Sequence, residues 1–334
     1  MVSFADWRVG DDGRLGPILH DCLQAATAAP SIHNTQPWRF RPRADGVDVF
    51  ADHTRRLGVV DPSGREVLIS VGAALLNLRI AVLAHGRTPL TQLMPDGDET
   101  DRVGRVTFGR PVHVSETVRM LGQAIPRRRT NRRPFSNATI PREVLAELID
   151  SAATEGGRLT VADPGMREAV LSLVRLAERR ERDEPAYWAE LGEWTGRWPH
   201  RRDGVPPEAY GPWSAMETVP IRDFGLIEPA RRRQVQDFEE EPTIAVLYTA
   251  ADSPRQWVLA GQALERTLLT ATVRGVATTL MTQPMEIPKL RDLLVDSAAS
   301  LVPQLIVRFG YGPPSAPTPR RPLEEVVDGL GRVR

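Results

Sequence analysis

The chain has a single cysteine among its 334 residues, and Lys289 is the only lysine among its 43 basic residues. One cysteine, Cys22, excludes an internal disulfide and any CxxC redox or zinc motif. The six histidines show neither HxxxH nor HExxH spacing, so we expect no metal site. Because nearly all the positive charge is carried by arginine, the abundance of arginine alone indicates no function.

Net charge is also lacking. The chain has 43 basic and 43 acidic residues, so no long-range field would attract nucleic acid or an anionic membrane. No charged-then-apolar leader opens the sequence, and we expect no apolar run of membrane-spanning length. A hydrophobic content of 41% is ordinary for a globular protein with a large core. These absences predict a soluble, cytoplasmic protein that binds neither nucleic acid nor membrane.

The residues that are present predict an α+β fold. Apolar periodicity predicts helices over 17–29, 65–85, 141–153, 164–182, 254–274 and 288–295. Alternating or continuous apolar runs predict strands over 38–42, 47–51, 88–93, 103–108, 243–249, 276–281 and 301–309. The helix over 65–85 is apolar on nearly all sides, which is typical of a buried helix. Residues 183–235 differ in kind, because four of the seven tryptophans lie there.

One loop contains the largest cluster of side chains suited to binding a polar ligand. Residues 29–38 read Ala-Pro-Ser-Ile-His-Asn-Thr-Gln-Pro-Trp and connect an apolar helix to an alternating segment. Pro30 prevents the helix from continuing, and Pro37 favours an extended Gln36. Ser31 and Asn34 could direct a hydroxyl and a carboxamide at a planar ligand with polar edges. On residue types alone, the simpler interpretation is favoured, a helix stop followed by an Asx-type turn.

The loop closely resembles the Pro-Ser-x-x-Asn-x-Gln-Pro-Trp motif of the nitroreductase family of flavin mononucleotide (FMN) enzymes. The resemblance implies central sheets flanked by helices. It also implies that the flavin is contacted or shaped by Pro30, Ser31, Ile32 and Asn34.

A second, distant motif strengthens the resemblance. The run that begins the second half is similar to the family's Arg-Arg-Ser-x-Arg element, and a pair near the end is similar to its C-terminal basic segment. The residues concerned are Arg128, Arg129, Thr130 and Arg132 in the run, and Arg320 and Arg321 near the end. Planar guanidinium groups bind phosphate oxygens bidentately, which suits the FMN phosphate. A solvated basic turn is the alternative interpretation of the run.

The sequence departs from the family at one point. Family members usually place a Glu-Gly pair near flavin N5, and this chain has none at the expected place. Thr282 and Gln283 are the nearest substitutes. The resemblance therefore does not extend to the usual nicotinamide-docking geometry, although flavin binding is unaffected.

The helices over 65–85 and 254–274 look like copies of each other. Gly72 precedes Gly86 by fourteen residues, as Gly261 precedes Gly275. This pattern predicts an internal duplication, with convergent burial patterns as the alternative. The first half has the Pro-Ser loop without an arginine element, whereas the second half has the arginine element and residues 154–157 in place of the loop.

Ordinary family members are homodimers that build each FMN site across their interface. The chain accordingly resembles the Acg-like, twin-domain branch, which implies a fused pseudo-dimer, monomeric, with one complete FMN site. The predicted halves are residues 1–115 and 116–334, and the tryptophan-rich insert covers about 183–235.

The resemblance implies an FMN-dependent oxidoreductase that takes electrons from NADPH or NADH. Its substrates would be small nitroaromatic, quinone-like or other conjugated electrophiles. No catalytic side chain is predicted, because the flavin carries the chemistry. The aromatic residues of the insert predict that it forms either a cap on the core or a lid over the flavin, and the lid is slightly favoured. The alternative function is an FMN-sequestering protein with little turnover, and a dehydrogenase acting on a dedicated intermediate is a third interpretation.

Overall fold

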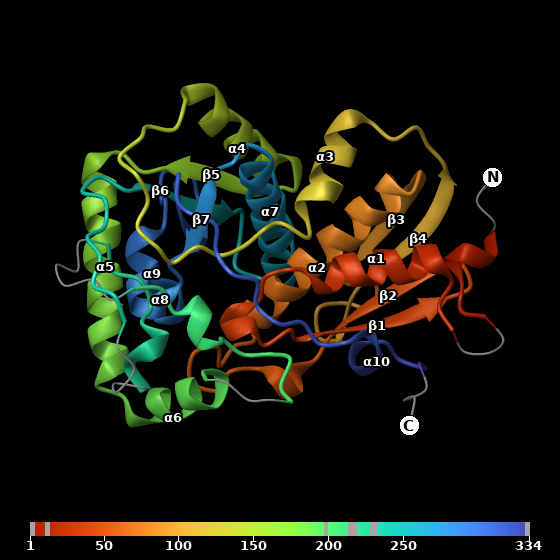
Figure 1. The fold of residues 1–334 in the computed structure, drawn as a ribbon, viewed down its shortest axis with the longest axis horizontal. Coiled ribbons are helices and arrows are strands. Elements are labelled where there is room, and N and C mark those ends of the chain that lie inside the picture. The colour runs from red at the N-terminus through yellow and green to blue at the C-terminus, as the bar shows by residue number, and fades with distance from the viewer. Residues whose placement is uncertain (1–3, 11–13, 197–199, 213–218, 228–232, 331–334) are drawn as a thin grey trace.

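The computed structural model describes residues 4–10, 14–196, 200–212, 219–227 and 233–330. These residues form two four-stranded antiparallel sheets with the strand orders β1-β2-β4-β3 and β5-β6-β8-β7 (Figure 1). The strands of the first sheet are β1 (Trp38–Arg43), β2 (Gly46–Ala51), β3 (Arg87–Leu93) and β4 (Arg102–Pro111). Those of the second are β5 (Arg158–Val161), β6 (Thr243–Thr249), β7 (Ala277–Leu280) and β8 (Val302–Gly310).

Helices pack around and between the sheets, so the α+β prediction is confirmed. The longer ones are α1 (Pro17–Thr27), α2 (Arg65–Ala84), α3 (Glu116–Ala124), α4 (Arg142–Thr154), α5 (Pro164–Arg182), α6 (Pro185–Trp194) and α7 (Pro254–Val273). The short ones are α8 (Gln283–Glu286), α9 (Pro288–Arg291) and α10 (Leu323–Val326). The two 20-residue helices α2 and α7 pack against each other at the centre of the molecule (Figure 1).

The two halves follow the same path. The order α1-β1-β2-α2-β3-β4 recurs as α4-β5-β6-α7-β7-β8, with α5 and α6 inserted between β5 and β6. A register shift interrupts the β2–β4 pairing between Val49 and Phe50, and another interrupts β6–β8 between Leu247 and Tyr248. This common topology agrees with the predicted repeat. Its origin in a fused dimer stays a prediction.

Glycines allow α2 and α7 to approach closely. A Cβ added to Gly72 would lie 2.3 Å from the carbonyl oxygen of Val258, and one added to Gly261 would lie 2.0 Å from that of Ile69. Each helix therefore presents a glycine to the backbone of the other. The glycines just beyond the two helices, Gly86 and Gly275, both have positive φ, +79° and +69°, as expected of residues that end helices.

Helix α2 corrects one expectation. It is long and apolar enough to cross a membrane by length and composition, so the prediction that no apolar run reaches that length was wrong. Almost all of its side chains are buried, however, against α1, the first sheet, α3 and α7. A core position accounts for its apolar character.

The structure differs from the sequence-based expectations in several short elements. Strand β5 and helices α6, α8 and α10 were not expected, and the helix expected over 288–295 ends at Arg291 and continues as a 3-10 turn. Trp188 and Trp194 lie on α6, whereas Trp198 and Trp213 lie outside the described residues.

The C-terminal segment returns to the first half. It crosses the molecule from β8 and places α10 beside β1 (Figure 1). The backbone N–H of Asp328 donates to the carbonyl of Phe40 at 2.8 Å, and Leu323, Val326 and Val327 belong to the core around α1 and α2. The predicted halves, 1–115 and 116–334, are therefore interlocked in space at this end.

Candidate functional site

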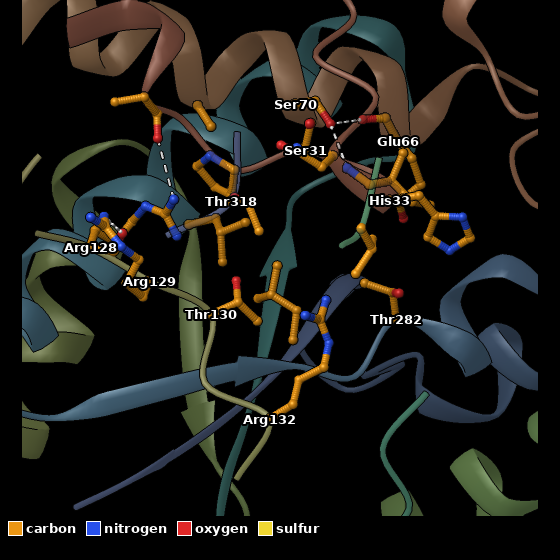
Figure 2. A pocket seen from close by; sticks show the side chains of 18 of the residues that line it. Ser31, His33, Glu66, Ser70, Arg128, Arg129, Thr130, Arg132, Thr282 and Thr318 are labelled. Carbon is orange, nitrogen blue, oxygen red and sulfur yellow. Dashed lines mark hydrogen bonds between the residues drawn. The ribbon is translucent and has the colours of Figure 1, made fainter. Parts of the chain in front are cut away.

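A pocket of about 230 Å³ lies where the two halves meet. Its walls come from the loop after α1, the first turns of α2, the run 126–132, the end of β7 and the C-terminal arm (Figure 2). The tryptophan-rich insert adds Val205, Arg222 and Phe224. Segments that are far apart in sequence thus form one cavity.

The loop after α1 has a strained, tightly bonded conformation. His33, Asn34 and Gln36 have φ values of 44°, 55° and 51°, in the left-handed region that residues other than glycine rarely adopt. The Ser31 hydroxyl accepts a hydrogen bond from the backbone N–H of Gln36 at 2.9 Å. This bond closes the loop, and the end of the loop leads directly into Trp38, the completely buried first residue of β1.

Asn34 ties the loop to two distant segments. Its side-chain amide donates to the carbonyls of Gly204 at 3.0 Å and Pro319 at 3.1 Å, and its oxygen accepts from Arg320 at 3.0 Å. The side chain therefore holds the insert and the C-terminal arm beside the loop. Sequence motifs alone placed Asn34 at a ligand and gave no signal of this connecting role.

One end of the pocket is strongly basic. Arg128 and Arg129 lie there side by side, with Arg128 almost completely buried (Figure 2). Arg320 also lines the pocket and acts electrostatically on both, so it belongs to the same end. Burial, Arg128 and Arg129 lower the pKa of Arg320 to about 9. Burial and, to a smaller extent, the charge of Arg128 lower the pKa of Arg129. These shifts mean that the three charges repel one another without enough solvent to screen them. An anion at this end would relieve the repulsion.

Arg128 and Arg320 reach this end by bonding to the loop. An Nη of Arg320 donates to the carbonyls of Ala28 and Ala29 at 3.2 and 3.0 Å, and Arg128 donates to that of Ala28 at 3.3 Å. Nε and one Nη of Arg128 and Nε of Arg320 are buried without a hydrogen-bond partner among the described residues. Unused donors of this kind are expected where a ligand with several acceptor oxygens binds.

The other end of the pocket is more varied. Glu66 and Ser70 of α2, Thr282 and Arg132 face it (Figure 2). Phe224, which Arg132 contacts, also lines the pocket. Burial raises the pKa of Glu66 to about 7 despite the neighbouring Arg65. Burial and Arg222 lower the pKa of Arg132 to about 10, and its guanidinium stacks on Phe224 at 4.7 Å.

Arg222 fixes the insert against the rest of the site. It donates to both carboxylate oxygens of Glu286 at 2.6 and 2.5 Å and to the Tyr187 hydroxyl at 3.3 Å. Another contact, 3.1 Å long, joins it to Nε2 of His33. Because arginine can only donate, Nε2 must accept and the proton of His33 lies on Nδ1. Burial and the charges of Arg222 and Arg132 hold the pKa of His33 well below its usual value, so the ring is neutral.

The structure brings most of the predicted residues to this pocket. Those that line it are Pro30, Ser31, Ile32, Asn34, Arg128, Arg129, Thr130, Arg132, Thr282 and Arg320. Gln283 and Arg321 are not among the lining residues. Gln283 is buried and donates to Glu178 at 3.4 Å, and Arg321 contacts Gln36 and Glu325. That the lining residues bind a cofactor stays a prediction.

Sequence reasoning missed several residues of the site. They are His33, Glu66, Ser70, Val205, Arg222, Phe224 and Thr318. His33 lay inside the recognised loop, where its position alone could have drawn attention to it. The others come from α2, the insert and the C-terminal arm, and no local pattern separates them from ordinary core or surface residues.

Comparison with known proteins identifies the class. The nitroreductase family matches residues 125–311, more than half of the chain. The "Putative NAD(P)H nitroreductase acg" of Mycobacterium tuberculosis is 31% identical over 318 residues, 92% of this chain and 95% of that protein. A second "Putative NAD(P)H nitroreductase" of the same organism is 34% identical over 316 residues, 92% and 90% of the two chains. The chain belongs to the nitroreductase family, and it is an oxidoreductase of the nitroreductase type.

Solved structures give weaker likenesses. A nitroreductase with bound FMN from Bacteroides fragilis matches with a TM-score of 0.37 and 15% identity, over 60% of this chain and 93% of that one. The FMN- and NADPH-dependent nitroreductase NfnB from a Sphingopyxis strain matches with a TM-score of 0.39 and 17% identity, over 62% and 97%. The family assignment rests on the sequence matches.

Proposed function

We propose that the protein binds FMN in this pocket and transfers electrons from NADPH or NADH to small conjugated electrophiles, such as nitroaromatic or quinone-like compounds. The observation that carries the proposal is the meeting of the Pro-Ser loop with Arg128, Arg129 and Arg320 in a single cavity. The loop and the arginines come from opposite halves of the chain, and neither alone would form a site.

The residues of the pocket fit FMN. A phosphate dianion matches the basic end, because its oxygens can accept from buried guanidinium donors that lack other partners. The loop 30–34, Thr130, Arg132 and Thr282 would then hold the ribityl chain and the ring. A cationic Arg132 suits the pyrimidine edge of a flavin, where the negative charge of the reduced form gathers. When bound, FMN would supply the hydride chemistry.

The family and the names of the relatives support this function. Two relatives in Mycobacterium tuberculosis carry names that describe NAD(P)H nitroreductases. A flavin oxidoreductase needs no nucleophile from the protein, which agrees with a pocket lined by positioning groups. The particular electrophile and the preference between NADPH and NADH belong to this proposal.

The test is anaerobic mixing of the flavin-loaded protein with NADPH or NADH. We expect prompt bleaching of the oxidised flavin absorbance, followed by recovery when a nitroaromatic compound or a quinone is added. A flavin that binds but stays oxidised with both reductants would contradict the proposed turnover.

An FMN-sequestering protein is the second candidate, and the insert is the observation that favours it. Val205, Arg222 and Phe224 cover part of the pocket, and Arg222 is held by a buried carboxylate pair, Glu286 and Glu181. A cover held so firmly would limit entry of a nicotinamide. A bleaching rate that rises when Phe224 is replaced by alanine would support a role of the insert as a lid.

A further inference from the structure

Glu265 lies beneath the basic end of the pocket, on the face of α7 that meets α2. Its side chain is completely buried, and one carboxylate oxygen is 3.6 Å from Nε of Arg128. Neither carboxylate oxygen has a hydrogen bond of normal geometry among the described residues. A buried carboxylate without hydrogen bonds is costly, so its place beside a ligand-facing arginine calls for an explanation.

The neighbours of Glu265 also have buried polar atoms without a hydrogen-bond partner among the described residues. Seven of the buried polar side-chain atoms that lack a hydrogen-bond partner among the described residues belong to Asn77, Arg128, Glu265 and Arg320. These four side chains come from α2, the run after α3, α7 and the C-terminal arm. Unpaired polar atoms are thus concentrated at and beneath the basic end of the pocket, which Arg128 and Arg320 line.

We propose that Glu265 is a positioning residue that holds Arg128 and Arg320 in place before an anion binds, and that it takes up one proton when a phosphate group arrives. The inference rests on the proposed function, because it assumes that FMN is the phosphate-bearing ligand. In the free protein the carboxylate balances the buried arginines. In the complex the phosphate provides that balance, and two anions then share the same pair of guanidinium groups.

Electrostatics gives the direction of the effect. Burial raises the pKa of the Glu265 carboxyl to about 7, while Arg128, the Asn77 amide and Arg320 each act to lower it. The contact with Asn77 is polar but falls outside normal hydrogen-bond geometry. A phosphate dianion beside Arg128 adds negative potential and raises the pKa of Glu265 further. At a pH between the pKa of the free protein, about 7, and the higher pKa of the complex, binding is then accompanied by proton uptake, since Glu265 is mostly ionised before binding and mostly protonated after it.

Because FMN binding and protonation of Glu265 are linked, the affinity for FMN should fall measurably as the pH rises. As the pH rises above about 7, Kd for FMN should increase by up to roughly tenfold per pH unit until the pKa of the bound state is reached. The phosphate itself is dianionic throughout this range, because its second pKa is about 6. Riboflavin has the same ring without the phosphate, so its Kd should show no such slope.

The experiment uses the full chain stripped of flavin and measures binding by flavin fluorescence between pH 7 and 8, below the pKa of about 9 of Arg320. Calorimetry at pH 8 in buffers of different ionisation enthalpy gives the number of protons taken up. We expect the wild type to take up between zero and one proton with FMN and none with riboflavin. A riboflavin slope equal to the FMN slope would overturn the proposal.

Two variants complete the test. Glu265→Gln keeps the shape and removes the charge, so between pH 7 and 8 its Kd should be nearly independent of pH and, at pH 8, lower than that of the wild type. The matched control is Glu155→Gln, because Glu155 is another buried carboxylate that contacts α7. Glu155 pairs with Arg79 and Arg266, each at 2.5 Å, and does not line the pocket. This control should keep the wild-type slope.

The outcomes separate the two proposals. FMN binding with the same slope in Glu265→Gln and in the wild type would overturn the role of Glu265 and leave the proposed function intact. Failure of the wild type to bind FMN at any pH would overturn both. If Glu265→Gln does not fold, as shown by circular dichroism, the comparison of FMN with riboflavin in the wild type between pH 7 and 8 still decides the question, because Arg320, with a pKa of about 9, stays mostly protonated in that range.

Discussion

Three consecutive arginines after α3 have different surroundings, although they look alike in the sequence. Arg127 is exposed and donates to the carbonyl of Gln123. Arg128 is buried beside Glu265, and Arg129 is half-buried and lines the pocket. Replacing each of the three by alanine should therefore have a different effect on flavin affinity and stability.

Arg129→Ala should weaken FMN binding with little effect on the fold. A charge-assisted hydrogen bond contributes about 1.5–3 kcal/mol, so Kd should rise roughly 10- to 150-fold. Fluorescence titration measures the change. Arg127→Ala is the control from the same run and should keep the Kd of the wild type. Equal effects of the two replacements would show that the run acts only as a diffuse positive patch.

Arg128→Ala should lower stability as well as flavin affinity, and the loss should depend on pH. Removal of Arg128 leaves Glu265 buried without its main partner, which costs about 3–5 kcal/mol when the carboxylate is charged. Because burial already raises the pKa of Glu265 to about 7, the carboxylate can bind a proton below that pH and reduce the cost. The variant should therefore lose more stability at pH 8 than at pH 6.

Urea unfolding of the flavin-free proteins at the two pH values measures this difference. Arg129→Ala serves as the reference, because Arg129 donates to the backbone carbonyls of Pro126 and Arg128 and pairs with no buried carboxylate in the part of the chain that the structure describes. Losses of equal size at pH 6 and pH 8 would mean that Glu265 is not the group left unpaired.

At the scale of the element, the packing of α2 on α7 leads to a prediction about glycine. Gly72→Ala would place a Cβ 2.3 Å from a backbone oxygen of α7, and backbone cannot move aside as a flexible side chain can. We expect the free energy of unfolding to fall by about 1–3 kcal/mol, the usual cost of overpacking. Chemical denaturation measures it.

Gly192→Ala is the matched control for that prediction. Gly192 also lies inside a helix, α6, but beyond its chain neighbours and the backbone of its own helix none of the described residues has an atom within 4 Å of a Cβ built there. Alanine should be neutral or should stabilise the protein by up to about 1 kcal/mol, because it restricts the unfolded chain and favours the helix. A Gly72→Ala variant as stable as this control would mean that the two central helices can separate at little cost.

Elements with a strong pattern could be predicted from the sequence, and others could not. The periodic apolar residues of α5 and α7 and the apolar run of β6 gave nearly the observed bounds, since burial of one face or of a whole strand leaves a long regular signal. Strand β5 has four residues, too few to show a period. Helix α6 lies among tryptophans and prolines that suggested an irregular segment.

The residues of the site likewise fall into those that could be predicted from the sequence and those that could not. The loop 30–34 and the run 128–132 were found because each is a compact local motif. Arg222 and Glu265 were not, because their importance comes only from residues far away in sequence, such as His33 and Arg128. Arg320 and Arg321 show the limit of local evidence, since they are neighbours of the same type and yet only Arg320 lines the pocket.

At the scale of the whole molecule, the two halves predict a stoichiometry of one FMN per chain. The loop between α1 and β1 covers residues 28–37, whereas its counterpart between α4 and β5 covers only 155–157. Glu155 in that short connection is already paired with Arg79 and Arg266, and a Cβ at Gly157 would lie 2.6 Å from Ala263. A second loop site therefore has neither the length nor the space. Flavin absorbance against protein concentration measures the ratio, and two FMN per chain would contradict this reasoning.

The same arrangement predicts that a single chain holds its flavin. In one chain, α2 packs on α7, and the pocket combines a loop of the first half with arginines of the second. Covalent connection gives the halves an effective concentration of roughly the millimolar range, so the site does not depend on the concentration of the protein. We expect a flavin-loaded monomer that keeps its cofactor until the dilution approaches Kd for FMN itself. Light scattering and flavin fluorescence across a dilution series, with free FMN held constant, separate the two equilibria. If flavin were retained only in a species of two chains, Asn34 and Arg320 would have to meet across an interface rather than through the 3.0 Å hydrogen bond they form within one chain.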